Sequence, residues 1–289
     1  MAHKTAQTAG GKRRVWPVRV LTTTWHFTRY LLNRRYPDRF RLLRDYWKIQ
    51  FWLRVQPKRT KPLRLLGYTV HYPSLYLLRH LFNEVVLEPT YRYDAPRHNP
   101  VIIDAGANIG LATLFYKYQY PKARITCFEP DPRSFAVLQR SIEANGFTDV
   151  TAYNVALSNQ PGNLTLYYDE SFEGDTTASI SKEFRSHTGK GQLSAEQVPA
   201  EPLSKYLNQP VDLLKIDIEG SEGKVFADIG SSLGKVAAIQ MEFHYDREHN
   251  PLHPVIETLE RGGHDWQLMA PGTLRSQPGS VAVLYSWRR

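Results

Sequence analysis

The feature that most constrains the fold of this chain is a glycine-rich turn that follows a short apolar segment. Residues Val101 to Gly110 read V-I-I-D-A-G-A-N-I-G, and R-I-T-C-F-E-P-D follows at Arg124 to Asp131. The β-branched residues that open the first motif predict a strand buried on both faces of a parallel sheet. A turn, a helix and a second strand that ends in an acid follow, so the segment predicts a nucleoside-binding βαβ unit.

Two residues in the turn distinguish between the cofactors that such a unit can bind. A dinucleotide-binding turn reads G-x-G-x-x-G, because the pyrophosphate lies against the N-terminus of the next helix. Here Asn108 replaces the middle glycine, and the carboxylate of Asp104 would repel a pyrophosphate and attract a cationic sulfonium. Glu129, at the end of the second strand, is placed to bind two ribose hydroxyls. These residues favour S-adenosylmethionine over NAD; the alternative is a glycine turn with no ligand.

From Val101 onward, strand and helix patterns alternate, which is typical of a doubly wound parallel sheet. Helices are predicted over about 109–118 and 132–145. Strands are predicted near 101–104, 124–128, 150–155, 212–217 and 236–242, with a final antiparallel pair near 265–269 and 281–286. The predicted fold class is therefore α/β, with a doubly wound, mostly parallel seven-stranded sheet and a basic helical N-terminal extension.

Charged side chains follow two of the predicted strands at their carboxyl ends, where open α/β sheets bind ligands. In L-K-I-D-I-E-G, Lys215, Asp217 and Glu219 alternate, so an extended chain places them on one side. Glu242 and His244 have the same spacing after the next strand. We expect Asp217, Glu219, Glu242 and His244 to converge on one pocket and to be the catalytic residues.

Three readings of this cluster stay open. His244 is the natural general base, because an imidazole titrates near neutral pH, and Asp217 or Glu242 orients it or takes the proton directly. Alternatively, Asp217, Glu242 and His244 hold a divalent metal ion that polarises an acceptor hydroxyl. The structural alternative for Asp217 and Glu219 is capping of the loop at Gly220, and for His244 it is an exposed polar loop.

Five motifs in register then point to a family. They are D-A-G-A-N-I-G, F-E-P-D, N-V-A-L-S at Asn154 to Ser158, L-K-I-D-I-E-G-S-E at Leu214 to Glu222 and M-E-F-H at Met241 to His244. With these motifs the chain resembles the FkbM-type S-adenosylmethionine-dependent methyltransferases from about Leu65 to the C-terminus. The resemblance implies the class I, Rossmann-like fold and O-methylation of a sugar, glycolipid or polyketide-like acceptor, with bacterial pathways common.

The turn motifs and the resemblance together give a set of expected cofactor-binding residues. Asn154 to Leu157 resembles the family segment that flanks the adenine, with a plain strand end as the alternative. Asp131 is expected both to start a helix and to flank the ribose. The full set is Asp104, Gly106, Ala107, Asn108, Gly110, Glu129, Asp131, Asn154 and Ala156.

The first part of the chain differs from the rest in charge. Met1 to Arg64 carries 17 Lys and Arg against two acids, a net +15, whereas the remaining residues carry 20 basic and 26 acidic groups, a net −6. Four of the six tryptophans also lie in this first part. We therefore divide the chain into a basic, Trp-rich, helical N-terminal extension over residues 1–62 and an S-adenosylmethionine-dependent methyltransferase domain over residues 63–289.

Two helices are predicted in the extension, over about 18–33 and 38–56. On the second, Arg41, Arg44 and Lys48 fall on one face and Leu43, Tyr46, Trp47 and Leu53 fall towards the other. Such a helix can bind an anionic membrane surface, pack on the body as a cap, or mediate oligomerisation. Membrane binding would suit a lipid-linked acceptor.

Composition also bears on location. The single cysteine, Cys127, cannot form an internal disulfide, and no signal peptide or transmembrane segment is recognisable. We expect a cytoplasmic protein, with peripheral attachment to the inner face of the membrane if the extension binds lipid.

The basic extension raises the alternative of an enzyme that acts on RNA. In an RNA ribose 2'-O-methyltransferase the extension would bind phosphates, but no RNA-binding module is recognisable, so nucleic acid is not the expected partner. A second alternative is a membrane-surface or assembly protein with a degenerate methyltransferase fold. The intact acids in every motif argue against this loss of activity.

The polar stretch Asp169 to Gln197 lacks periodicity, which predicts a substrate-facing loop or disordered filler.

Overall fold

The computed structural model describes residues 37–169, 178–179, 193–269 and 280–288. The chain divides into two compact units, Met1–Arg44 and Asp45–Arg289. This division comes earlier in the chain than the domain boundary predicted after residue 62, which stays a prediction. The helix predicted over 18–33 lies outside the described residues.

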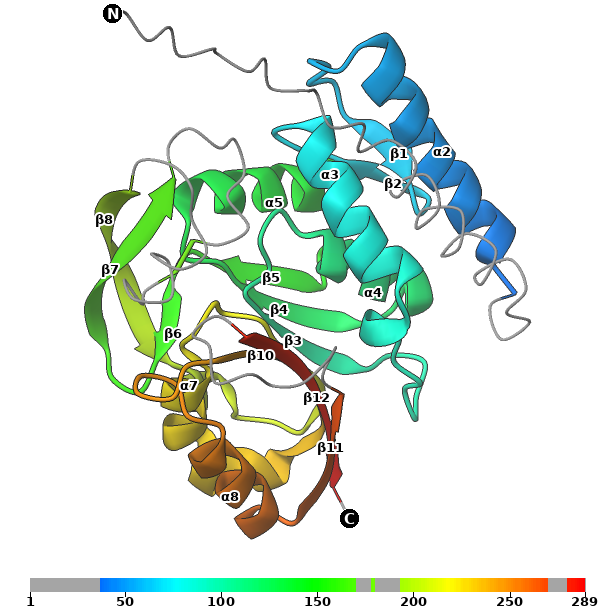
Figure 1. Cartoon of the computed structure of the whole chain (residues 1–289). Helices are drawn as coiled ribbons and strands as arrows, with labels where there is room; N and C mark the ends of the chain where they lie inside the picture. Colours follow the sequence, from blue (N-terminus) through cyan, green and yellow to red (C-terminus); the bar gives the residue numbers. More distant parts are fainter. Residues whose placement is uncertain (1–36, 170–177, 180–192, 270–279, 289) are drawn as a thin grey trace, which may run out of the picture. The chain divides into compact units, whose positions relative to one another are not determined.

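A seven-stranded sheet forms the centre of the larger unit (Figure 1). Its order is β11-β12-β10-β9-β3-β4-β5, and all neighbours are parallel except β12, which runs antiparallel to both β10 and β11. The predicted fold class and all seven predicted strands are confirmed. The strands are β3 (Val101–Ala105), β4 (Arg124–Phe128), β5 (Val150–Tyr153), β9 (Val211–Ile216), β10 (Val236–Tyr245), β11 (His264–Met269) and β12 (Ser280–Arg288).

The sheet order creates a crevice for a ligand. The chain runs outward from β3 to β4 and β5 and then returns to the other side of β3 as β9, so the order reverses between β3 and β9. Open α/β sheets bind ligands beyond the carboxyl ends of the strands at such a switch point. Every residue of β3 and β9 is buried, and this includes the charged residues Asp104, Asp212 and Lys215.

Helices cover both faces of the sheet. The helices α4 (Leu111–Gln119) and α5 (Pro132–Ala144) lie on one side, and α7 (Glu222–Ile229) and α8 (His253–Arg261) lie on the other (Figure 1). One group of buried apolar residues joins α7 and α8 to the central strands. Burial of this apolar surface is the main force that holds the layers together.

A short helical layer precedes the sheet. The hairpin β1 (Leu63–Leu65) and β2 (Tyr68–Val70) leads to α3 (Leu75–Leu81), where the Ser74 side chain accepts a hydrogen bond from the Leu77 amide at 3.2 Å. A wide π-helical turn, η1 (Phe82–Leu87), and a 3-10 turn, η2 (Pro89–Tyr91), follow directly. Such wide turns often occur at functional sites, and this one carries a polar residue described below.

The predicted loop from Asp169 to Gln197 needs a correction. A second sheet has the order β6-β8-β7, and β8 (Leu193–Pro202) pairs antiparallel with β7 (Gly162–Asp169), while β6 (Ala156–Ser158) is parallel to β8. The last residues of the predicted loop therefore form a strand. In β8 only Val198 and Ala200, near its C-terminal end, are buried. The alternation of apolar and polar residues that would predict a strand is therefore short, and the residues before it are mostly polar. Residues 170–177 and 180–192 lie outside the described residues.

The helix predicted over 38–56 is confirmed as α2 (Arg39–Val55). One detail of its pattern is wrong, because Trp47 is 51% exposed rather than turned towards the apolar side. Phe51 and Val55 follow at helical spacing and are 56% and 61% exposed. The helix thus presents a second apolar stripe to solvent. Among the described residues, no helix combines the length and apolar character that crossing a membrane requires.

Candidate active site

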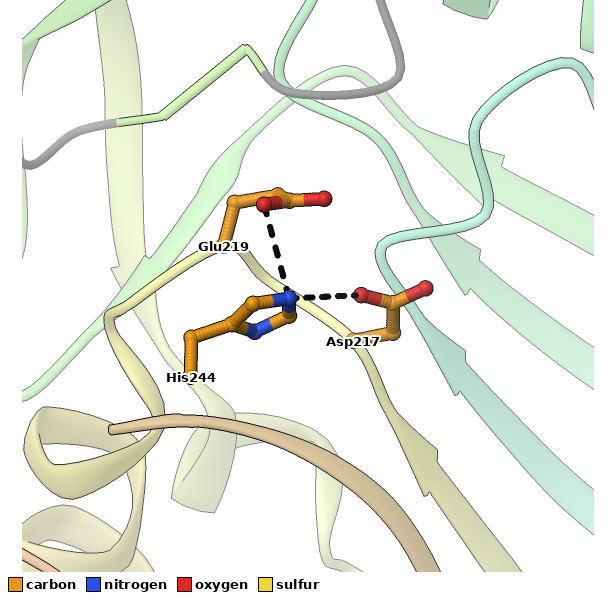
Figure 2. Close-up of side chains that lie close together, drawn as sticks. All are labelled: Asp217, Glu219 and His244. Carbon is orange, nitrogen blue, oxygen red and sulfur yellow. Dashed lines mark ion pairs between the residues drawn. The ribbon is translucent and has the colours of Figure 1, made fainter. Parts of the chain in front are cut away.

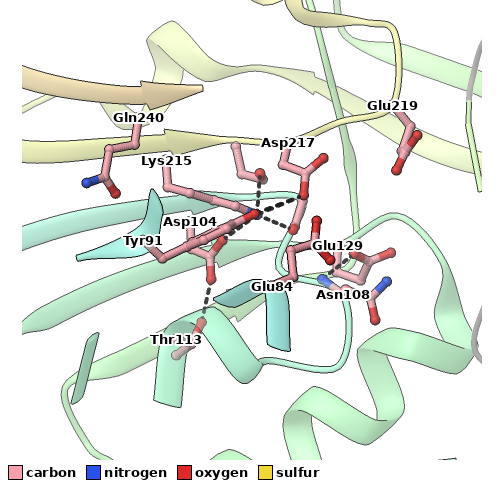
Figure 3. Close-up of polar contacts among 12 residues, drawn as sticks. Glu84, Tyr91, Asp104, Asn108, Thr113, Glu129, Lys215, Asp217, Glu219 and Gln240 are labelled. Atoms are coloured by element: carbon pink, nitrogen blue, oxygen red, sulfur yellow. Dashed lines mark hydrogen bonds and ion pairs between the residues drawn. The ribbon is translucent and has the colours of Figure 1, made fainter. Parts of the chain in front are cut away.

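A cavity of about 340 Å³ opens at the carboxyl ends of the central strands. It brings together the glycine-rich turn, the ends of β4, β9 and β10, the small sheet and the α3–η1 layer, several of which are drawn in Figure 3. Its lining residues are His80, Leu81, Glu84, Gly106, Asn108, Phe128, Glu129, Pro130, Val155, Ala156, Leu157, Leu166, Ala178, Asp217, Ile218, Glu219, Ser221, Glu242, His244 and Val281.

The turn after β3 requires glycine at one position. Gly106 has a φ of +78°, and a Cβ there would lie 1.7 Å from the backbone oxygen of Asp217. The amides of Gly106 and Ala107 both donate to the Phe128 carbonyl at 2.9 Å, and the Asp217 amide donates to Ala105 at 3.0 Å. These bonds tie the turn to the ends of β4 and β9, so the backbone of the turn is fixed before any ligand arrives.

Glu129 is held against this turn. Its carboxylate accepts hydrogen bonds from the backbone amides of Asn108 at 2.7 Å and Asp131 at 2.9 Å. Burial raises the pKa of Glu129 to about 8, although the two amide bonds act in the opposite direction. A buried carboxylate in the cavity wall is the group that the sequence predicted for ribose hydroxyls.

Asp104 requires a correction. Its carboxylate is fully buried, accepts a hydrogen bond from the Thr113 hydroxyl at 2.7 Å and lies 3.2 Å from the ammonium of Lys215 (Figure 3). Asp104 does not line the cavity. The expectation that this carboxylate faces a sulfonium is therefore wrong, because Lys215 already neutralises its charge beneath the turn. A sequence pattern cannot show that a lysine on the neighbouring strand meets this acid.

The other expected cofactor residues fall into two groups. Gly106, Asn108, Glu129 and Ala156 line the cavity, and Ala107, Gly110, Asp131 and Asn154 do not. Two residues of the second group stabilise the backbone around the cavity instead. Asp131 caps α5 by accepting from the Arg133 amide at 3.1 Å, and the Asn154 side chain donates to the carbonyls of Glu129 and Pro130 at 2.8 and 3.0 Å.

The predicted catalytic residues meet in the cavity. Asp217, Glu219, Glu242 and His244 all line it. The Nε2 atom of His244 lies 3.5 Å from Glu219 Oε2 and 4.0 Å from Asp217 Oδ1, as Figure 2 shows. The predicted convergence of the two strand ends is confirmed, whereas the catalytic roles of these residues stay predictions.

The set of possible metal ligands differs from the predicted one. Asp217, Glu219 and His244 each offer one ligand atom, and these atoms lie within 4.8 Å of one another. Glu242, which the sequence placed in this set, is not part of it within the described residues. Glu219 takes its place, and its backbone adopts a left-handed φ of +52° in the loop between β9 and α7.

Two residues that sequence reasoning missed fix the histidine. Glu222 is fully buried, and its Oε1 lies 2.9 Å from Nδ1 of His244. The Asn250 side chain donates to Glu222 Oε2 at 2.5 Å and to the carbonyl of His244 at 2.8 Å. The only available signal for Glu222 is its position three residues after Glu219 in the E-G-S-E segment; nothing in the sequence marks Asn250.

Comparison with known proteins decides the family. A family model described as "Methyltransferase FkbM domain" matches residues 104–265, which include the turn from Asp104 to Gly110 and all four predicted catalytic residues. The chain belongs to the FkbM methyltransferase family. The resemblance to this family and the predicted methyltransferase class are thereby confirmed.

Several curated proteins that are similar to this chain are described as methyltransferases. Methyltransferase sdnD of Sordaria araneosa is 29% identical over 209 residues, which are 63% of this chain and 75% of the relative. The 2-O-methyltransferase NoeI of Sinorhizobium fredii is 27% identical, covering 56% and 71% of the two chains. The 31-O-demethyl-FK506 methyltransferase FkbM of Streptomyces tacrolimicus is 28% identical, covering 56% and 73%.

The chain is also similar to a solved structure. The crystal structure of Methyltransferase FkbM from Methylobacillus flagellatus KT is 13% identical, covers 94% of this chain and 60% of that chain, and has a TM-score of 0.44.

The electrostatics of the methyltransferase site are dominated by buried acids. Burial, followed by repulsion from Asp217, raises the pKa of Glu84 to about 7 and that of Glu242 to about 8. Burial alone would lower the pKa of His244, but Glu219 and Glu222 raise it well above its usual value. These two acids therefore favour the imidazolium form of His244 over the neutral ring. The predicted role of His244 as general base stays a prediction.

The α3–η1 layer adds two more polar groups to the site of the FkbM-family enzyme. Glu84 of η1 lines the cavity, and the hydroxyl of Tyr91 donates to Asp217 Oδ2 at 3.4 Å (Figure 3). Both residues precede the segment that the family model matches. The N-terminal part of the larger unit thus contributes directly to the site, which motif spacing within the matched segment cannot reveal.

Proposed function

We propose that this protein is an S-adenosylmethionine-dependent O-methyltransferase that methylates a hydroxyl of a sugar, glycolipid or polyketide-like acceptor. The observation that carries the proposal is one cavity that contains both a nucleoside-type wall and a cluster of buried acids around His244. The first suits the cofactor, and the second suits removal of a proton from an acceptor hydroxyl.

The residues of the cavity fit the proposed cofactor. The turn at Gly106 is a cradle that a Cβ would fill, and Glu129 presents a carboxylate beside it. Phe128, Val155 and Leu157 supply an apolar surface of the kind that a flat adenine contacts. S-adenosylmethionine supplies an activated methyl group on a cationic sulfur, and a cavity lined by carboxylates favours that charge.

The acids of the cavity can serve methyl transfer to oxygen. The hydroxyl oxygen bonds to the methyl carbon as the carbon–sulfur bond breaks, and the hydroxyl proton must leave. Glu242 would take this proton, because it lines the cavity beside Asp217 and His244 and its pKa of about 8 makes it a stronger base than an ordinary carboxylate. Asp217 would orient the acceptor, and the hydroxyl of Tyr91 would hold the Asp217 carboxylate in position. Positioning of this kind supplies much of the rate.

The names of two relatives support oxygen as the acceptor atom. NoeI is described as a 2-O-methyltransferase, and FkbM is described as acting on 31-O-demethyl-FK506. Both descriptions concern methylation of oxygen, and we carry that chemistry to this chain as a proposal.

The proposal is tested by incubating the protein with methyl-labelled S-adenosylmethionine and separate acceptors: a methyl glycoside, a glycolipid, a hydroxylated macrolide and a short RNA. Label is expected in a hydroxyl of at least one of the first three. The Glu242→Gln variant should lower kcat, whereas Glu257→Gln, an exposed acid on α8, should leave kcat unchanged. Label in RNA alone, or in nitrogen or carbon alone, would contradict the proposal.

We further propose that the exposed stripe of α2, made of Trp47, Phe51 and Val55, binds an anionic membrane surface. The basic side chains of Lys48 and Arg54 flank this stripe and are exposed. Apolar side chains that enter the headgroup region beside Lys and Arg on the same helix are the pattern of interfacial helices. Such binding would bring the cavity to a lipid-linked acceptor.

A further inference from the structure

We propose that Asp217, Glu219 and His244 form a binding site for a divalent cation of the Mg²⁺ or Mn²⁺ class. The cation site stands on geometry alone. Its role in methyl transfer, which is to hold the acceptor hydroxyl, rests on the proposed function.

The spacing of the three groups suits one ion. Nε2 of His244 lies 3.5 Å from Glu219 Oε2 and 4.0 Å from Asp217 Oδ1, and all three ligand atoms lie within 4.8 Å of one another (Figure 2). Bonds of about 2.1 Å from a central ion place neighbouring ligand atoms about 3 Å apart and opposite ones about 4 Å apart. Small rotations of the two carboxylates would therefore complete the coordination.

The ring of His244 has the second hydrogen-bond partner that is typical of metal-binding histidines. Nδ1 of His244 contacts the buried carboxylate of Glu222 at 2.9 Å, so Nε2 is the ring nitrogen that faces the other two ligands. Glu222 is anchored in turn by the side chain of Asn250 and by the amide of Gly220 at 3.2 Å. Histidines that bind metals nearly always donate their second nitrogen to such a carboxylate, which fixes the ring.

An independent observation at the same place indicates a missing polar ligand. Ser221 follows Glu219 by two residues, lines the cavity and is 2% exposed. Its Oγ has no hydrogen-bond partner among the residues that the structure describes. A buried hydroxyl without a partner is costly, so a ligand at this point is expected to bond to it. A water molecule on the proposed cation would satisfy the Ser221 hydroxyl.

The donor set selects the class of cation. Two carboxylates and one imidazole favour a hard ion that accepts nitrogen, and Mn²⁺ accepts an imidazole more readily than Mg²⁺ does. The single cysteine, Cys127, is buried and does not line the cavity, so no thiolate is available for a soft metal. Glu84, Glu129 and Glu242 add further carboxyl groups to the cavity wall, so the surroundings of the proposed site are rich in oxygen donors.

Glu242 then has a separate task. It lines the cavity but is outside the cation cluster. With the acceptor oxygen bound to the cation, the hydroxyl proton would pass to the Glu242 carboxylate as the oxygen–carbon bond forms and the carbon–sulfur bond breaks. This division of labour separates the ligand His244 from the base, and it replaces the metal set that the sequence predicted.

The test begins with the full chain, from which metals are removed with a chelator and dialysis. The protein is then titrated with Mn²⁺ alone, and the electron paramagnetic resonance signal of the free ion measures how much Mn²⁺ is bound. The wild-type protein should bind one Mn²⁺ per chain, and its Tm should rise as Mn²⁺ is added. Asp217→Asn and Glu219→Gln should abolish both effects. Glu222→Gln should weaken binding by about 10- to 100-fold, as loss of an outer partner does.

Two controls decide the assignment. Glu257→Gln, on the exposed surface of α8, should bind Mn²⁺ as the wild type does. Glu242→Gln should keep Mn²⁺ affinity within about tenfold, because Glu242 is outside the set of ligand atoms and the substitution removes no bond to the ion. Absence of Mn²⁺ binding by the wild type, or loss of binding in Glu242→Gln but not in Glu219→Gln, would overturn the proposal.

Calorimetry with S-adenosylhomocysteine in the presence of chelator tests the proposed function separately, because cofactor binding does not need the cation.

Discussion

The ammonium of Lys215 lies 3.2 Å from the carboxylate of Asp104, and both side chains are buried under the glycine-rich turn. The same ammonium donates to the carbonyl of Gly106 at 2.6 Å and lies 3.8 Å from Asp217 Oδ2. One lysine of β9 thus joins the acid at the end of β3, the turn itself and the first residue of the acidic cluster. The relationship makes Asp104 part of the frame of the site rather than of its wall.

The first prediction concerns this buried pair. Lys215→Met should lower the free energy of unfolding by about 3–5 kcal/mol, because it leaves the Asp104 carboxylate buried without its partner. Urea unfolding followed by circular dichroism measures the change. The double variant Lys215→Met with Asp104→Asn should recover part of the loss. If the single variant lost less than about 1 kcal/mol, or the second change gave no recovery, the pair would not hold the turn as described.

The second prediction concerns the turn. Gly106→Ala should abolish binding of S-adenosylhomocysteine and lower the Tm, because the new Cβ would meet the backbone oxygen of Asp217 at 1.7 Å. Gly146→Ala is the matched control: its φ is +62°, but nothing lies within 4 Å of the added carbon. The control should cost only about 1 kcal/mol of stability and leave cofactor affinity intact. Equal effects of the two substitutions would mean that the close approach to Asp217 is unimportant.

The third prediction uses the titration of Glu242. Its pKa is about 8 in the folded protein against 4.5 for the ordinary group, so between these values the unfolded chain releases a proton that the folded chain retains. This group therefore makes stability fall as pH rises from about 4.5 to about 8. Glu242→Gln removes that contribution.

The Tm difference between Glu242→Gln and wild type should therefore widen in favour of the variant between pH 5 and pH 9, by about 2–6 °C. Thermal unfolding in matched low-salt buffers, without metal or cofactor, measures it. Glu257→Gln serves again as the exposed control. A gap that stays constant or closes over this range would show that Glu242 is not held protonated by burial and by Asp217.

The fourth prediction concerns the exposed stripe of α2. Trp47→Ser combined with Phe51→Ser should reduce co-sedimentation with vesicles that contain phosphatidylserine, because apolar side chains that insert into the headgroup region are lost. The enzyme should keep its Tm, since both side chains are exposed. Tyr76→Ser, at another exposed aromatic residue, is the matched control. Binding that needs no anionic lipid, or that the double variant retains, would exclude this surface.

Sequence patterns could predict the frame of the molecule because each strand and helix of the sheet carries its own local signal. The β-branched run before Asp104 and the i, i+2 acids after β9 depend only on neighbours in the chain. The strand β8 escaped notice because its partner β7, rather than its own composition, makes it a strand. Trp47 was misplaced for a similar reason: helical periodicity gives a face but not what covers it.

Within the site, residue types were predictable and pairings were not. The sequence placed Asp217, Glu219, Glu242 and His244 together, and they line one cavity. It could not show that Lys215 neutralises Asp104, nor that Glu222 takes Nδ1 of His244, because these contacts join separate strands and loops. Charges on neighbouring strands decide which acid faces a ligand, and only the fold brings them together.

The most direct test of the account is the affinity of S-adenosylhomocysteine measured by calorimetry on wild type and on Glu129→Ala. We predict that the wild type binds, and that Glu129→Ala loses about 10- to 100-fold in affinity, because two hydrogen bonds between ribose hydroxyls and a carboxylate disappear. Glu143→Ala, an exposed acid on α5, should bind as the wild type does. A wild-type protein that does not bind S-adenosylhomocysteine, or a folded Glu129→Ala variant with unchanged affinity, would contradict the central claim.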